Sequence, residues 1–174
     1  MKNWISIWIA LVFVGCSNSE SNINFEAILK KADHTVVMFL APDCPLCMTL
    51  STPFSQLANQ YPDVQFLGVI SGNHYEAMEI NMFATEKSFK PRIFRDYDYA
   101  IASSLKASIT PEFLLLDSAG NTIYQGMLDD RILSLGSYKQ TWNEHYLKDA
   151  LDAVISGKKP TVAETEAIGC VLEY

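Results

Sequence analysis

Uninterrupted runs of apolar residues alternate along this chain with segments in which apolar residues recur every three or four positions. Such runs are typical of strands buried on both faces of a sheet, and the spacing is typical of amphipathic helices. The runs predict strands over residues 35–40, 64–70, 93–94, 112–117 and, after a turn at 118–121, 122–127. The spacing predicts a helix that ends at residue 61 and others over residues 24–32, 75–89, 96–107 and 142–155. This alternation indicates an α/β protein.

The N-terminal residues have the pattern of a targeting segment. Residues 4–14 are apolar except for Ser6, and Lys2 is the only charge among the first 15 residues. This run is too short to span a bilayer as a helix, which needs about 20 apolar residues. Its length instead matches the hydrophobic region of a signal peptide.

Residues 13–16, Phe-Val-Gly-Cys, resemble a bacterial lipobox, in which a lipidated cysteine becomes the first residue of the mature protein. We therefore predict a lipoprotein signal peptide over residues 1–15, a lipid on Cys16, a polar tether over 16–24 and a folded domain over 25–174 with a C-terminal helix and tail. The alternative is cleavage elsewhere, which leaves Cys16 as an ordinary thiol. The anchor predicts a place in the bacterial cell envelope, facing the periplasm or on the outer membrane.

Size and charge narrow the class of protein. The chain has 174 residues, 49% of them hydrophobic, which suits one packed domain. The 13 Lys and Arg residues against 20 Asp and Glu residues give a net charge of −7, without a basic cluster. Such a chain is a poor nucleic-acid binder, because those proteins contact phosphates through basic patches. The sequence leaves the oligomeric state open.

Cys44, Pro45, Leu46 and Cys47 form a Cys-x-x-Cys motif between a predicted strand and the helix that follows it. A thiol at a helix N-terminus lies close to unpaired N–H groups, which favour the nucleophilic thiolate. Cys47 lies one turn further along the same face, near enough to form a disulfide. The motif also supplies half of a zinc site, but no second Cys-x-x-Cys or Cys-x-x-His follows. We predict no metal and no cofactor.

Thr110 and Pro111 directly precede the predicted strand at 112–117. A cis bond between them would form a turn that brings the backbone beside the Cys-x-x-Cys motif. We expect this bond to be cis. The alternative is a trans proline that only begins an edge strand.

The Cys-Pro-x-Cys motif after a strand, Thr110-Pro111 before a strand and the hairpin at 117–120 resemble the redoxin branch of the thioredoxin fold. A bacterial thioredoxin-like subgroup related to peroxiredoxins is similar to this chain in residues 124–131, 146–151, 157–158 and 165–170. The resemblance implies a central mixed β-sheet flanked by helices. It also implies Cys44 as the attacking thiol, Cys47 as the resolving thiol and Pro111 as the cis-proline beside them.

The same resemblance implies a substrate-docking surface at Pro45, Leu46 and Thr110. Three positions depart from related families. Ala41 stands where peroxiredoxins have a threonine, Met38 where thioredoxins have a buried aspartate, and Leu50 where membrane-anchored reductases often have a glutamate. The sequence therefore shows no carboxylate to accept the proton of Cys47.

These features predict an exported, membrane-anchored thiol–disulfide oxidoreductase that acts on protein or small-molecule thiols and disulfides. The alternatives are a thiol peroxidase, a Cu(I) carrier and a non-catalytic binding module of the envelope whose disulfide is only structural. Copper carriers of this fold space their cysteines as Cys-x-x-x-Cys and add a histidine. Here the spacing is shorter, and the histidines are scattered at residues 34, 74 and 145.

Four other positions receive a structural interpretation. Met78 and Met82 have helical spacing, which predicts packing in the core. Asp129 and Asp130 are expected to be solvated or to have a capping role beside Arg131 rather than to bind a cation.

Cys170 lies in a tail whose apolar residues predict packing against the domain. We interpret it as mainly structural, because buried free cysteines are common. Disulfide exchange with Cys44 is the alternative.

Overall fold

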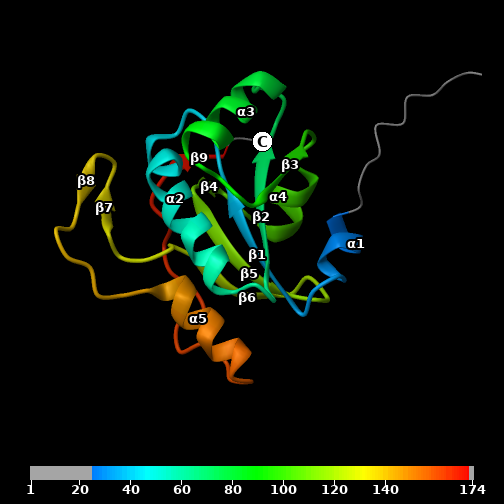
Figure 1. Cartoon of the computed structure of the whole chain (residues 1–174), viewed down its shortest axis with the longest axis vertical. Helices are drawn as coiled ribbons and strands as arrows, with labels where there is room; N and C mark the ends of the chain where they lie inside the picture. Colours follow the sequence, from blue (N-terminus) through cyan, green and yellow to red (C-terminus); the bar gives the residue numbers. More distant parts are fainter. Residues whose placement is uncertain (1–24, 173–174) are drawn as a thin grey trace, which may run out of the picture.

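The computed structural model describes residues 25–172. The predicted signal peptide, the tether and Cys16 lie outside the described residues. A mixed sheet with the strand order β3-β2-β1-β5-β6 forms the centre of the domain (Figure 1). β1 pairs parallel with β2 and antiparallel with β5, β2 pairs parallel with β3, and β5 pairs antiparallel with β6. The strands are β1 (His34–Phe39), β2 (Gln65–Ser71), β3 (Arg92–Asp96), β5 (Glu112–Asp117) and β6 (Thr122–Gly126).

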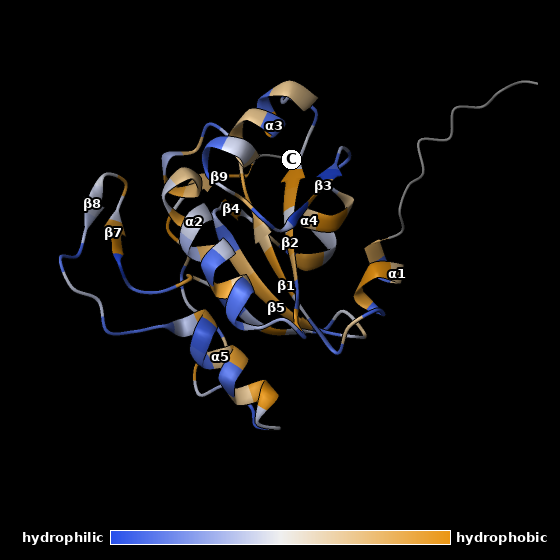
Figure 2. Cartoon of the chain, in the orientation of Figure 1, coloured by the Kyte–Doolittle hydropathy of each residue, from blue (hydrophilic) through white to orange (hydrophobic). Residues whose placement is uncertain are grey.

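Helices cover both faces of this sheet, so that the strands bury both sets of side chains. In β1, Val36 and Met38 belong to a core packed against α2, α3 and α5, whereas Val37 and Phe39 face a second core under α1 and α4. Figure 2 shows the hydrophobic character of the central strands between these layers. The helices are α1 (Phe25–Leu29), α2 (Pro45–Gln60), α3 (Ala77–Glu86), α4 (Ala100–Leu105) and α5 (Tyr146–Ile155).

The predicted α/β class and the mixed sheet flanked by helices are confirmed. β5 has the predicted bounds, but three helices begin later than the spacing predicts. Before α3, Glu76 and Glu79 form a capping box. Before α4, Asp96 ends β3 and its carboxylate accepts hydrogen bonds from the N–H groups of Ile101 and Ala102. These polar contacts fix the helix starts in a way that apolar spacing does not reveal.

The prediction that Met78 and Met82 lie in the core is wrong. Their side chains are 70% and 53% exposed, while Ile80 and Phe83 of the same helix are buried. A spacing of four residues places two side chains on one helix face, but it does not say which face meets the sheet.

Four short strands were not predicted. They are β4 (Ile109–Thr110), β7 (Ile132–Ser134), β8 (Ser137–Tyr138) and β9 (Cys170–Val171). β7 and β8 form a hairpin that projects from the domain in Figure 1. β9, in the C-terminal tail, pairs with β4, which directly precedes Pro111. No helix within residues 25–172 has both the length and the apolar character to cross a membrane.

Candidate functional site

The Cys-x-x-Cys motif lies where β1 ends and α2 begins. Cys44 is the N-cap residue of α2 in an extended conformation, and Pro45 occupies the first turn. The Cys44 N–H donates to the carbonyl of Ala41 at 3.1 Å, which closes the loop between strand and helix. Cys47, one turn into the helix, is fully buried, and its sulfur accepts a hydrogen bond from the Ala41 N–H at 3.4 Å. The loop therefore holds both thiols at the carboxyl end of β1.

The Thr110–Pro111 bond is cis, as predicted. It joins β4 to β5, and because β5 pairs with β1, it lies beside the start of α2. In its protonated form, the Cys44 thiol donates to the Thr110 carbonyl at 3.3 Å. Two segments that are 66 residues apart in sequence thus meet at one sulfur atom.

A third thiol reaches the same sulfur from the C-terminal tail. Cys170 pairs with Thr110 in the antiparallel β4–β9 ladder, and its Sγ lies 3.1 Å from the Cys44 Sγ. The two cysteines are 126 residues apart in sequence. The cysteines at 44, 47 and 170 are free thiols.

The three thiols differ in acidity. The pKa of Cys44 is lowered to about 5, first because the Cys47 thiol donates a hydrogen bond to it, although partial burial opposes this shift. The pKa of Cys47 is raised because the residue is buried and lies beside Cys44. The pKa of Cys170 is raised to about 11, first by its hydrogen bond to Cys44 and then by desolvation. Cys44 is therefore the thiolate at neutral pH, and the other two thiols keep their protons.

A cavity of about 290 Å³ opens beside Cys44. Cys44 and Cys170 line it, together with side chains from the loop after β2 and from the start of α4, namely His74, Tyr75 and Tyr99. The Tyr75 hydroxyl donates to the carboxylate of Asp43, and burial together with this bond raises the Tyr75 pKa. Tyr99 and His74 lie within hydrogen-bond distance, at 3.3 Å. The sequence pattern did not reveal these wall residues, although the carboxyl ends of the parallel strands β1 and β2 meet at one edge and so bring their loops together.

The three proposed docking residues have different positions. Pro45 is exposed. The Leu46 side chain is 0% exposed and packs in the core, so it does not form a docking surface in this structure and that assignment is corrected. Helical geometry explains the difference, because adjacent residues of a helix point in different directions. The Thr110 side chain is also buried, and its backbone edge is already paired with β9.

Glu112 is a further residue near the site that was not predicted from the sequence. It follows Pro111 and is 6% exposed. Its carboxylate accepts hydrogen bonds from the Ser108 N–H at 3.2 Å and from the Gln125 amide at 2.9 Å, and burial raises its pKa. The first bond ties the residue before β4 to the start of β5, and the second ties β5 to β6. A carboxylate that begins an otherwise apolar strand is the signal that could have identified it.

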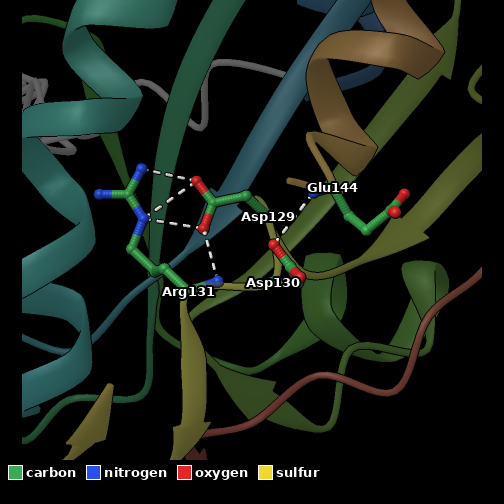
Figure 3. Close-up of polar contacts among 4 residues, drawn as sticks. All are labelled: Asp129, Asp130, Arg131 and Glu144. Carbon is green, nitrogen blue, oxygen red and sulfur yellow. Dashed lines mark hydrogen bonds and ion pairs between the residues drawn. The ribbon is translucent and has the colours of Figure 1, made fainter. Parts of the chain in front are cut away.

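The acidic pair at residues 129–130 lies in the segment between β6 and β7 (Figure 3) and does not line the cavity beside Cys44. Asp129 is 5% exposed and holds Arg131 through a bidentate ion pair, with 2.6 Å between the closest atoms. Asp130 pairs with Lys139 and accepts a hydrogen bond from the Glu144 N–H at 3.1 Å. The predicted capping role beside Arg131 is confirmed for Asp129, whose carboxylate accepts a hydrogen bond of 3.1 Å from the Arg131 N–H, whereas the ion pairs were not predicted. Among the described residues, no group of three His, Cys, Asp or Glu side chains is arranged to hold a metal ion.

No family model and no curated protein matches the chain. Solved structures do match. A hypothetical protein from Sinorhizobium meliloti 1021 superposes with a TM-score of 0.73 at 21% identity, over 85% of this chain and 83% of that one. An uncharacterized conserved protein from Geobacillus kaustophilus gives a TM-score of 0.71 at 25% identity, over 83% and 79% of the two chains.

A thioredoxin-like protein in its oxidized form is also similar, with a TM-score of 0.54 at 16% identity over 73% of this chain and 80% of that one. At these identities the likeness concerns the fold. The strand order, the cis-proline and the cysteine pair at the start of α2 agree with it. The chain therefore has a thioredoxin-like fold.

Proposed function

We propose that this protein is an exported, lipid-anchored thiol–disulfide oxidoreductase in which Cys44 is the nucleophile and Cys47 its partner. The observation that carries the proposal is the place of Cys44: its sulfur lies at the N-terminus of α2 and receives hydrogen bonds from other thiols, and its pKa is lowered to about 5. A thiolate is the species that attacks disulfides.

The reaction is a two-electron exchange. The Cys44 thiolate attacks one sulfur of a substrate disulfide, and the other substrate sulfur leaves as a thiolate. Cys47 then loses its proton and attacks the Cys44 sulfur of the mixed disulfide, which releases the second substrate thiol. The protein ends with a Cys44–Cys47 disulfide, and two electrons have passed to the substrate. The reverse sequence oxidises a dithiol.

The test is reduction of a disulfide substrate, 2-hydroxyethyl disulfide, by the reduced protein. We expect Cys44→Ser to lower the rate by at least ~1000-fold, because the nucleophile is lost. Met48→Leu, next to the motif, is the matched control and should leave the rate unchanged. If Cys44→Ser reacts like the wild type, the proposal fails. Parallel measurements of peroxide turnover and of Cu(I) binding test the two other chemistries.

Export and anchoring rest on residues 1–16 of the sequence. In the native host, we expect Cys16→Ser to release the protein from the membrane fraction, since the residue that would carry the lipid is removed. Cys170→Ser is the control for loss of a cysteine elsewhere. Membrane attachment that survives Cys16→Ser would refute the lipid anchor.

A further inference from the structure

The backbone edge beside the cis-proline is occupied by the chain's own tail. In the β4–β9 ladder, Ile109 pairs with Val171 and Thr110 with Cys170. The ladder is extended by a hydrogen bond of 2.8 Å from the Leu172 N–H to the Ser108 carbonyl. Addition of an extended peptide to a free strand edge is a common mode of peptide recognition. Here β9 takes the position that such a peptide would take. Cys170 lies where a cysteine of a bound peptide would approach Cys44.

The tail is fitted closely to this edge. A Cβ atom on Gly169 would lie 2.2 Å from the Thr110 carbonyl oxygen, a distance that no side chain tolerates. Upstream, the backbone of Gln125 in β6 exchanges hydrogen bonds of 3.0 Å with Ala163 and Thr165. The chain is therefore held on both sides of Cys170, which fixes the direction from which its thiol approaches Cys44.

The sulfur atoms are within reach of a bond. They are 3.1 Å apart, and a disulfide is about 2.05 Å long, so closure needs an approach of roughly 1 Å. The two candidate partners of Cys44 also differ in exposure, because Cys47 is 0% exposed and Cys170 is partly exposed. Solvent can thus accept the proton that Cys170 must lose before it attacks.

We propose that Cys170 is a third redox-active thiol, which resolves the mixed disulfide at Cys44 before Cys47 does. This rests on the proposed function of Cys44. The Cys170 thiolate attacks the Cys44 sulfur, a Cys44–Cys170 bond forms, and the substrate leaves as a thiolate that takes up the proton released by Cys170. Cys47 then attacks Cys44, displaces Cys170 and leaves the Cys44–Cys47 disulfide. The substrate disulfide is the only oxidant, and two electrons pass in total.

Electrostatics supports this order of events. Protonated Cys47 is favoured first by burial, which persists after Cys44 has reacted. Protonated Cys170 is favoured first by its hydrogen bond to Cys44, and a mixed disulfide at Cys44 removes that charged acceptor. The attack on substrate therefore makes Cys170 the easier thiol to ionise. The cavity of about 290 Å³ between β9 and the loop after β2 gives a small disulfide room while β9 stays in place.

The test is a single turnover of the reduced protein with one equivalent of 2-hydroxyethyl disulfide, followed by acid quench, alkylation and peptide mapping by mass spectrometry. In Cys47→Ser we expect release of the second thiol and a Cys44–Cys170 disulfide. In Cys170→Ser we expect the mixed disulfide to accumulate and its resolution to slow by at least ~10-fold. The double variant should remain a mixed disulfide.

A matched pair tests the geometry without removing a thiol. Gly169→Ala displaces β9 and should slow resolution as Cys170→Ser does, whereas Glu166→Ala, at an exposed position of the same tail outside the β4–β9 ladder, should behave as the wild type. If Cys47→Ser stalls as a mixed disulfide while Cys170→Ser and Gly169→Ala resolve at the wild-type rate, Cys170 is structural and the proposed function stands. If Cys44 forms no mixed disulfide in any variant, the proposed function fails together with this proposal.

Discussion

The thiol site and the cluster around Asp129 both hold ionisable groups out of solvent, but they hold them differently. At Asp129 the charge meets the Arg131 guanidinium in a bidentate pair (Figure 3). That guanidinium also lies 4.5 Å from the centre of the Trp142 ring. At Cys44 the charge is stabilised by neutral thiol donors and by the N-terminus of α2. A matched ion pair fixes structure, whereas a thiolate held by donors remains free to react.

The first prediction concerns loss of the Asp129–Arg131 ion pair. Asp129→Ala leaves the Arg131 guanidinium partly buried without its partner, and we expect the free energy of unfolding to fall by about 2–3 kcal/mol. Urea denaturation followed by circular dichroism measures it. Disulfide reduction should stay at the wild-type rate, because the cluster lies outside the thiol site.

Asp130→Ala is the matched control for this change. Its partner Lys139 is half-exposed, so solvent screens the pair and we expect a much smaller loss of stability than in Asp129→Ala. Equal losses in the two variants, or a loss of activity in Asp129→Ala, would contradict the distinction between the two regions.

The second prediction concerns the reactivity of the thiols with iodoacetamide. The lowered pKa of Cys44, about 5, means that its alkylation rate rises with pH up to about 6 and is then flat. Cys170, with a pKa of about 11, should still gain reactivity at pH 10. At pH 7 we expect Cys44 to react at least ~10-fold faster than Cys170. The difference is smaller than the thiolate fractions alone would give, because a thiolate of lower pKa is a weaker nucleophile.

Peptide mapping after brief alkylation assigns each rate to its cysteine. Ala replacements at 47 and 170 serve as controls, because each removes a donor to Cys44 and should shift its profile to higher pH. Identical profiles for Cys44 and Cys170 would mean that the site does not distinguish its thiols.

The third prediction concerns α3, which lies outside both regions, and the stability effect of substitutions on its exposed and buried faces. Met78→Ser and Met82→Ser should change the free energy of unfolding by no more than about 0.5 kcal/mol, since both side chains are exposed. Ile80→Ala, on the buried face of the same helix, should cost about 2 kcal/mol or more. A large loss in the methionine variants would show that this face is covered in solution.

The amino-acid sequence by itself determined the local parts of this protein. The apolar run of β5 predicted its bounds, and the order of strands and helices indicated the α/β class. The Cys-Pro-x-Cys motif after a buried run placed Cys44 at a helix start, and Thr110-Pro111 before a strand marked the cis bond. The strand and the helix start depend on residues within one or two turns of each other, so the local pattern is sufficient to predict them, whereas the cis bond was expected only because the Cys-Pro-x-Cys motif accompanies Thr110-Pro111.

Only the tertiary structure decided how distant segments meet. The two-residue strands β4 and β9 have no pattern of their own, and each exists because the other pairs with it. Their pairing brings Cys170 to Cys44 and fills the edge beside Pro111. The acidity of the three thiols follows from this arrangement, since each shift depends on burial and on a neighbouring sulfur. Contacts across 126 residues are set by the packing of the whole domain, which no short stretch of sequence encodes.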